Sequence, residues 1–197
     1  WTCALRSTSG STTRASWAAA RPMALGAAFH FDQIKEGKID FVPWLFIYYN
    51  ERSMEGCVDQ DAGAYIRDGL KSLNQIGVCS EKEWEYDESQ FTVRPTEGCY
   101  TAATANRALQ YARVPQTIED IKCVLKEGFP FVFGFTVLSS FRSDVVRRTG
   151  YMPMPQLEDE TLGGHAVMAI GYDDEKQVVI VRNSWSEGWG DAGYFYM

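Results

Sequence analysis

The sequence predicts an α+β protein whose helices come first and whose strands come later. In the first half, apolar residues recur at helical spacing over residues 24–37 and 61–77. In the second half, apolar runs of strand length occur at residues 131–137, 165–172 and 177–181. This order is typical of two lobes with a cleft between them. We assign residues 24–109 to a helical lobe and residues 110–197 to a β-rich lobe.

The composition indicates a globular protein and argues against two kinds of partner. The 197 residues are 45% hydrophobic and 14% aromatic, which is typical of a packed core. A net charge of −7 and the lack of a Lys/Arg cluster argue against nucleic-acid binding. No apolar run approaches the length of a membrane span, and the N-terminus lacks the build of a signal peptide.

Residues 24–37 are predicted to form a helix that packs closely against its neighbours. Its apolar face consists mostly of small residues: Ala24, Ala27, Ala28, Phe31 and Ile34. Gly37 is a suitable stop signal. His30 lies on this helix but off the apolar face. We interpret it as structural, because a catalytic histidine has to face a helix N-terminus from across a cleft.

Residues 61–77 are predicted to form the second helix. Ile66, Leu70 and Leu73 would face inward, Asp61 would cap the N-terminus and Gly77 would end the helix. The acidic stretch that follows, residues 80–90, is predicted to be a solvated loop.

The second half opens with a short helix. Thr117-x-x-Asp120 is a capping pattern for a helix that runs through Lys126 and ends before Pro130. Residues 140–162 are rich in Ser, Arg and Met. They are predicted to form a long connection beside the cleft, with no motif of their own.

The last two strands place a histidine beside an asparagine. Residues 173–176 form an acidic turn between two apolar runs, so the runs are predicted to pair as a hairpin that brings His165 and Asn183 opposite each other. An amide that accepts from one ring nitrogen fixes the tautomer and aims the other nitrogen at a reactant. A lone strand histidine is more often structural, but the aromatic, glycine-rich tail after Asn183 favours a catalytic pair.

Two motifs in this region resemble those of the papain-like cysteine peptidases. They are Gly-Gly-His165-Ala-Val and Asn183-Ser-Trp185, the second continued by Gly-x-Trp189-Gly-x-x-Gly-Tyr194. The resemblance extends upstream through Phe46-Ile-Tyr-Tyr-Asn-Glu-Arg52 and Asp61-Ala-Gly63-Ala64, and covers residues 24–197. It implies the papain-like two-lobed fold, in which a helical lobe and an antiparallel β-barrel-like lobe flank an active-site cleft.

The resemblance also implies a function and a set of roles. In such enzymes a cysteine thiolate attacks the scissile carbonyl, a histidine moves the proton, an asparagine orients the histidine and a tryptophan shields their hydrogen bond. By motif position the last three roles fall to His165, Asn183 and Trp185. The small residues Gly63, Ala64 and Ala166 would line the substrate site and leave room for an apolar side chain. The resemblance thus implies a peptide or protein substrate and no cofactor.

The sequence departs from the family at the nucleophile. Papain-like chains approach their cysteine through Gln-Gly-x-x-Gly-Ser-Cys, and the glutamine helps to bind the oxyanion. The corresponding stretch here runs from Arg14, at the glutamine position, to Ala20, at the cysteine position. Loss of a triad nucleophile removes nearly all of the acyl-transfer rate. The chain as written is therefore expected to be inactive.

A shift of reading frame would account for this departure. Residues 1–23 lose the resemblance all at once, whereas the sequence from residue 24 onward fits. Codons that encode residues 14–23, chosen freely where the code is degenerate and regrouped one base earlier, encode Gln-Gly-Gln-Leu-Gly-Ser-Cys-Thr-Ala-Asn. We interpret residues 1–23 as out of frame and expect them to be disordered.

Two other classes of protein stay open as alternatives. One is a non-catalytic homologue, a pseudoenzyme that binds peptides or serves as a scaffold, whose residues 1–23 are a real but divergent leader. The other is a different Cys-His-Asn acyltransferase, which fits the motif around Trp185 and Trp189 poorly.

The cysteines leave the redox compartment undecided. Cys57, Cys79 and Cys99 fall in the lobe where secreted family members carry disulfides, but they fit equally well as reduced buried thiols. Localisation stays open between lysosome, secretion and cytoplasm. No CxxC pair occurs and there are two histidines, so no metal site is predicted. The chain stops at Met197, just after the tryptophan motif, and we expect a closing strand to be missing.

Overall fold

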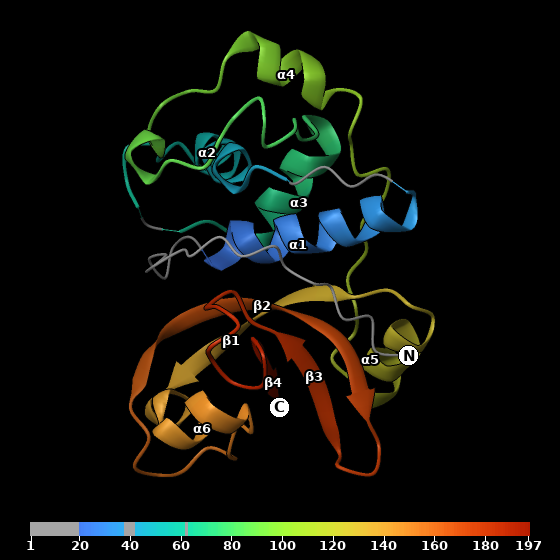
Figure 1. The fold of residues 1–197 in the computed structure, drawn as a ribbon, viewed down its shortest axis with the longest axis vertical. Helices are drawn as coiled ribbons and strands as arrows, with labels where there is room; N and C mark the ends of the chain where they lie inside the picture. The colour runs from blue at the N-terminus through green and yellow to red at the C-terminus, as the bar shows by residue number, and fades with distance from the viewer. Residues whose placement is uncertain (1–19, 38–41, 62) are drawn as a thin grey trace.

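The computed structural model describes residues 20–37, 42–61 and 63–197. The helices of the first half are α1 (Ala20–Lys35), α2 (Trp44–Glu55), α3 (Ile66–Gln75) and α4 (Glu97–Ala103). The strands are β1 (Phe131–Leu138), β2 (Thr161–Asp173), β3 (Val178–Arg182) and β4 (Tyr194–Tyr196). Figure 1 shows these helices of the first half above and the sheet below, with α1 next to the sheet. This is the α+β arrangement that the sequence predicts.

Helix α1 begins four residues earlier than predicted and is buried on several sides. Met23, Ala24 and Leu25 are all buried. Because consecutive helical residues point in different directions, burial of three in a row needs neighbours all round. Helices α2 and α3 supply them on one side, and β1 and β2 on the other. The predicted alanine face is therefore only part of the buried surface. Disorder was predicted for residues 1–23, but residues 20–23 form the start of α1, and residues 1–19 lie outside the described residues.

Helix α3 begins later than predicted, and its predicted cap is wrong. Its N-cap is Tyr65, which makes no side-chain cap bond. The Asp61 carboxylate instead accepts a hydrogen bond from the Tyr48 hydroxyl at 2.5 Å. Gly63, at a φ of 76°, interrupts any helical path from Asp61 to Ile66. The far end agrees with the prediction: α3 ends just before Gly77, whose φ of 87° suits glycine.

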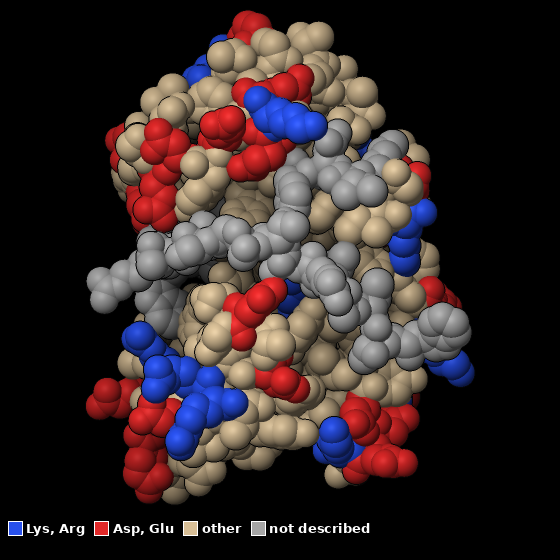
Figure 2. All heavy atoms as spheres, viewed as in Figure 1, with Lys and Arg blue, Asp and Glu red and all other residues tan. Residues whose placement is uncertain are grey.

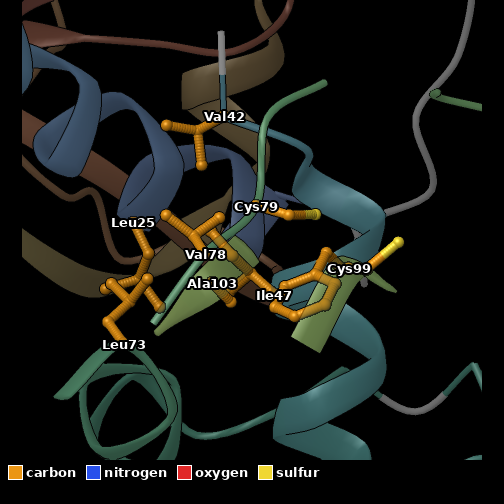
Figure 3. Close-up of a cluster of buried hydrophobic side chains, with 9 residues drawn as sticks. Leu25, Val42, Ile47, Leu73, Val78, Cys79, Cys99 and Ala103 are labelled. Atoms are coloured by element: carbon orange, nitrogen blue, oxygen red, sulfur yellow. The ribbon is translucent and has the colours of Figure 1, made fainter. Parts of the chain in front are cut away.

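A buried apolar cluster, drawn in Figure 3, holds the helical half together. Leu25 of α1, Phe46 and Ile47 of α2, and Leu73 of α3 all take part in it. Helix α4, which the sequence analysis did not predict, adds Cys99 and Ala103. The Thr96 side chain caps it by accepting from the Cys99 amide. The core thus fixes α1 against the helices behind it.

The acidic stretch, residues 80–90, is only partly the solvated loop that was predicted. Most of its carboxylates are exposed, but Trp84 packs against the helical core and Tyr86 meets the Trp44 ring edge-on at 6.0 Å. A short 3-10 helix, η1 (Glu88–Gln90), ends it. Figure 2 shows acidic side chains spread over the helical half. The aromatic residues therefore anchor a segment whose charges face water.

Residues 140–162 are more regular than predicted. They contain most of η2 (Ser139–Arg142), helix α6 (Asp144–Thr149) and the start of β2. The Ser143 side chain caps α6 by accepting from the Val146 amide, and Gly150 ends it at a φ of 74°. The capping prediction made upstream is confirmed, because Thr117 caps α5 (Ile118–Lys126) by accepting from the Asp120 amide at 3.1 Å.

The four strands form one antiparallel sheet in the order β1-β2-β3-β4. The predicted hairpin is confirmed, since β2 pairs with β3 and the Asp173 carboxylate accepts from the Glu175 and Lys176 amides in the turn. The β1–β2 register sets Phe135 opposite His165. The sheet thereby carries the candidate histidine in the strand against which α1 packs.

Candidate active site

His165 lies on β2 and is almost completely buried, with 2% of its surface exposed. Its ring meets that of its cross-strand partner Phe135 edge-on, with centroids 5.9 Å apart. Asn183 lies one residue beyond β3 and is also buried. The ladder ends at the Met168–Arg182 pair, so His165 and Asn183 are not ladder partners. Their side chains nevertheless meet, which confirms the predicted proximity.

The hydrogen bond between them identifies the tautomer. His165 Nε2 lies 2.8 Å from Asn183 Oδ1. The same oxygen accepts the backbone N–H of Ser184 at 2.9 Å, so the amide cannot be flipped without losing that bond. Because Asn183 therefore presents its oxygen, the imidazole must donate through Nε2–H. The neutral ring then carries its lone pair on Nδ1, and Nδ1 is the basic nitrogen.

Burial lowers the pKa of His165 below its ordinary value of 6.5, and the hydrogen bond to Asn183 opposes this only in part. Desolvation disfavours the charged imidazolium, whereas the asparagine oxygen stabilises it. The ring is therefore neutral near pH 7. Below about pH 6.5 the unfolded chain binds more protons at His165 than the folded chain does. The free energy of unfolding therefore decreases as the pH falls through this range.

This pKa is testable in the chain as written. A titration of the imidazole followed by NMR should give His165 a midpoint below 6.5, and Asn183→Asp should raise that midpoint, because a carboxylate stabilises the imidazolium. The variant His30→Gln leaves one histidine signal and so assigns the resonance. A midpoint at or above 6.5 in the unmodified chain would contradict the proposed desolvation.

Trp185 covers the histidine. The two rings stack with centroids 4.9 Å apart and planes 29° apart. The Trp189 ring packs edge-on against the Trp185 ring, with centroids 4.9 Å apart. The centroid of the Phe141 ring lies 5.6 Å from that of Trp185. Trp189 and Phe141 belong to a second buried apolar cluster, which includes Phe195 of β4, and Trp185 packs against it. The contact keeps bulk water from one face of the imidazole, where water would weaken the bond to Asn183.

Glycines in the tail allow Trp185 to take this position. Gly190 has a φ of 64°, and a Cβ there would lie 2.3 Å from the Tyr194 carbonyl oxygen. Gly193 has a φ of 87°, and its carbonyl oxygen accepts a hydrogen bond from the backbone N–H of Asn183 at 2.9 Å. Both positions therefore require glycine. The loop returns to the end of β3 and fixes Asn183 as well as Trp185.

The predicted substrate-site residues come from two elements that the fold brings together. Ala166 follows His165 on β2, is buried and pairs with Gly134 of β1. A Cβ at Gly134 would lie 3.8 Å from Ile66 Cδ1, so the segment that carries Gly63 and Ala64 approaches this strand pair. Ala64 and Gly63 are buried too. The structure thus places all three small residues near the junction of the two halves.

The sequence departs from the family at two functional positions, Ala20 for the nucleophile and Arg14 for the oxyanion-binding glutamine. Ala20 is the first residue of α1, which agrees with the predicted place of a nucleophile in the first turn of a central helix. Arg14 lies outside the described residues. His30 lies nearly three turns further along α1, and its pKa is lowered by burial and by the positive charge of Arg182. This position agrees with a structural role.

Sequence analysis assigned no individual role to two residues that shape the site. Tyr48 and Arg52 lie one turn apart on α2. The Tyr48 hydroxyl donates to Asp61 and accepts the Gly63 amide at 3.3 Å. Arg52 is fully buried and donates to the backbone carbonyls of Val58 and Gln60 at 2.6 and 3.3 Å. Their i, i+4 spacing was visible in the sequence, but nothing local indicated which distant backbone they bind.

Among the described residues, no group of three or more His, Cys, Asp or Glu side chains is arranged to hold a metal ion. The described part of the chain also contains no helix with the length and apolar character of a membrane span.

The fold and the buried His–Asn pair define a two-lobed α+β protein of the papain type. Residues 48–197 match the family described as papain family cysteine protease, and the chain belongs to this family. Xylellain, a cysteine protease from Xylella fastidiosa, is similar in structure, with a TM-score of 0.86 and 39% identity. That match covers 91% of this chain and 72% of xylellain.

Two curated relatives support the assignment. An uncharacterized peptidase C1-like protein of Acanthamoeba polyphaga mimivirus is 44% identical over 184 residues, which are 88% of this chain and 59% of the relative. Cysteine proteinase 2 of Entamoeba histolytica is 28% identical over 156 residues, 75% of this chain and 47% of that protein. The chain therefore spans roughly half of the length of these relatives.

Proposed function

We propose that this chain is the catalytic domain of a cysteine peptidase that hydrolyses peptide bonds by a Cys/His/Asn mechanism when position 20 carries cysteine. The observation that carries the proposal is the buried His165–Asn183 hydrogen bond under Trp185. It supplies a neutral imidazole of known tautomer, oriented by an amide and shielded from water on one face. A buried structural histidine needs neither the stacked tryptophan nor the fixed amide.

The first turn of α1 suits a thiolate nucleophile. A cysteine at position 20 would be the first residue of a 16-residue helix, where the backbone N–H groups and the helix dipole stabilise negative charge. In the proposed reaction Nδ1 of His165 takes the thiol proton, and the sulfur attacks the scissile carbonyl carbon. The imidazolium then gives the proton to the leaving amine, and water releases the acyl group through the same base.

We assign the substrate site to Gly63, Ala64 and Ala166. Their small side chains allow an extended peptide to approach the backbone of both halves. Ala166 directly follows the base, so a residue bound there would lie close to the reacting bond. The substrate class that follows is a peptide or an unfolded protein segment with an apolar side chain near the cleaved bond.

The chain as written lacks the nucleophile at Ala20 and is expected to be inert toward an epoxide-type covalent inhibitor of cysteine peptidases. The thiol of Cys79 is buried and has a raised pKa, so it has little thiolate to offer. Intact-mass analysis after incubation should show no adduct. Stoichiometric labelling that a peptide substrate blocks would show that another cysteine reaches His165 and would contradict the assignment of Ala20.

The matched comparison is the chain with the regrouped N-terminal motif. We call it the in-frame chain: residues 14–23 read Gln-Gly-Gln-Leu-Gly-Ser-Cys-Thr-Ala-Asn, and all other residues are unchanged. It should react with the same probe at position 20 and should hydrolyse fluorogenic peptides. If it folds and does neither, the proposed peptidase function fails.

The alternative is a pseudoenzyme that retains the peptide site without catalysis, which the alanine at position 20 favours. Sequencing of the transcript across residues 1–24 separates the two proposals. An insertion, deletion or splice error in that stretch supports the peptidase. A continuous reading frame supports the pseudoenzyme, which should then bind peptides in the chain as written.

A further inference from the structure

The carboxylate of Asp159 joins two segments of the β half that are distant in sequence. Its Oδ1 accepts a hydrogen bond from the Ser139 hydroxyl at 2.9 Å and another from the backbone N–H of Ser140 at 2.8 Å. Its Oδ2 accepts from the Ser140 hydroxyl and from the backbone N–H of Gln156, both at 2.9 Å. Three of these four donors belong to η2, and the fourth belongs to the loop before β2.

Asp159 is ionised at neutral pH, which strengthens these bonds. The backbone N–H of Gln156, together with the donors from Ser139 and Ser140, lowers the pKa of the Asp159 carboxyl from 3.8 to about 2, although desolvation opposes this shift. Hydrogen bonds to an ionised acceptor are stronger than those between neutral groups. The carboxylate is therefore a firm link between η2 and the loop.

The pairing of β1 with β2 is irregular beside this link. A register shift occurs between Val137 and Leu138, and such an irregularity locally disrupts the ladder of hydrogen bonds. Beyond it Ser139 and Glu160 exchange two hydrogen bonds, at 2.9 and 3.1 Å. Asp159 adds its four bonds at the same place. Its carboxylate thus holds η2 against the start of β2, where the regular ladder does not.

Phe141, which follows Ser140 in η2, connects this link to the candidate base. Its side chain is fully buried, and its ring centroid lies 5.2 Å from that of Phe135 and 5.6 Å from that of Trp185. Both of these rings pack against the imidazole of His165. Because protein interiors are close-packed, a displacement of Phe141 changes the packing of both rings.

We propose that Asp159 is a positioning residue for the candidate base: by holding η2, it keeps Phe141 against the two rings that pack on His165. Asp159 acts through Phe141. Loss of the carboxylate lets η2 move, loosens the packing of the rings and admits water to the imidazole and its bond to Asn183. The expected effect on catalysis rests on the proposed function, whereas the effect on the imidazole does not.

The test of the imidazole uses the chain as written with His30→Gln, which leaves His165 as the single histidine. Asp159→Asn keeps the size of the side chain but replaces one acceptor oxygen with a donor. We expect the NMR titration midpoint of His165 to rise by about 0.3–0.5 toward 6.5, because water relieves part of the desolvation. The loss of a negative charge alone would lower the midpoint, so the sign separates the two effects.

Two substitutions are matched controls. Glu158→Gln removes the same charge from the exposed neighbouring residue, and Thr96→Ala removes the cap of α4 in the helical half and so lowers the melting temperature. Both should leave the His165 midpoint unchanged within about 0.1, since neither acts on η2. A midpoint in Asp159→Asn equal to those of the controls overturns the proposal.

Ser140→Ala is the second variant, because it removes one hydroxyl donor to Asp159 and keeps the backbone N–H. It should raise the His165 midpoint by less than Asp159→Asn does. If Asp159→Asn does not fold, an unchanged midpoint in Ser140→Ala overturns the proposal in its place.

The in-frame chain tests the effect on catalysis. Asp159→Asn should lower kcat about tenfold and leave KM within about twofold, because misorientation of the base slows proton transfer more than it weakens substrate binding. Glu158→Gln and Thr96→Ala should leave both constants within about twofold. An unchanged kcat in folded Asp159→Asn, or a loss through KM alone, contradicts the positioning role. An in-frame chain without activity contradicts the proposed function instead, and the titration then still tests Asp159.

Discussion

Replacing His165 with alanine in the in-frame chain is expected to lower kcat/KM at least about 10³-fold, equivalent to about 4 kcal/mol of transition-state stabilisation. The imidazole supplies both proton transfers in the proposed mechanism, and the buried Nε2–H bond to Asn183 leaves Nδ1 as the base. Phe135 and Trp185, whose rings pack against the imidazole, carry no group that titrates. Steady-state hydrolysis of a fluorogenic peptide measures the effect.

Asn183→Ala should cost less, on the order of 10- to 10²-fold, because Trp185 still stacks on the ring and partly holds its orientation. The matched control is His30→Gln, which replaces the other histidine of the chain and should leave kcat/KM within about threefold. Equal losses for His165→Ala and His30→Gln would point to a general effect on folding. Retention of activity in folded His165→Ala would refute the assigned base.

The His–Asn pair could be predicted because local sequence determines it. A turn of acidic residues between two apolar runs specifies a hairpin, and the hairpin alone brings His165 near Asn183. The shielding role of Trp185 followed from the resemblance of the Asn183-Ser-Trp185 motif to that of the papain-like peptidases. The exact geometry could not be read from the pattern: the ladder stops before Asn183, and the loop that returns through Gly193 sets its position.

The less successful predictions have two causes, which are competition from distant partners and the shortness of some elements. Asp61 has the residue type of a helix cap, but Tyr48 from another helix binds its carboxylate. Residues 140–162 lack a long apolar period, so short helices that Ser143 and Gly150 delimit were not predicted. The acidic stretch hid Trp84 and Tyr86, whose ring contacts with the helical half depend on the tertiary fold.

Arg52 shows most clearly how distant partners determine the position of a side chain. Its replacement by methionine is expected to cause a larger loss of stability than the other substitutions. Its guanidinium has no exposed surface, lies over the Tyr48 ring at 4.0 Å and donates to backbone carbonyls of Tyr48, Val58, Gln60 and Phe91. Methionine keeps much of the volume but leaves these oxygens without their donor. At about 1 kcal/mol or more for each, the free energy of unfolding should fall by about 3–5 kcal/mol.

The loss should be visible as a melting temperature lower by about 6–15 °C and as faster proteolytic cleavage in residues 57–64, the segment that leads to Gly63 and Ala64. The melting temperature of Arg52→Lys should lie between those of Arg52→Met and the unsubstituted chain, because an ammonium cannot reach all four carbonyls at once. The control is Arg94→Met: Arg94 is exposed and pairs with Glu97 on the surface, so the melting temperature should stay close to that of the unsubstituted chain. Similar melting temperatures for Arg52→Met and Arg94→Met would contradict the view that the buried guanidinium holds the wall of the substrate site.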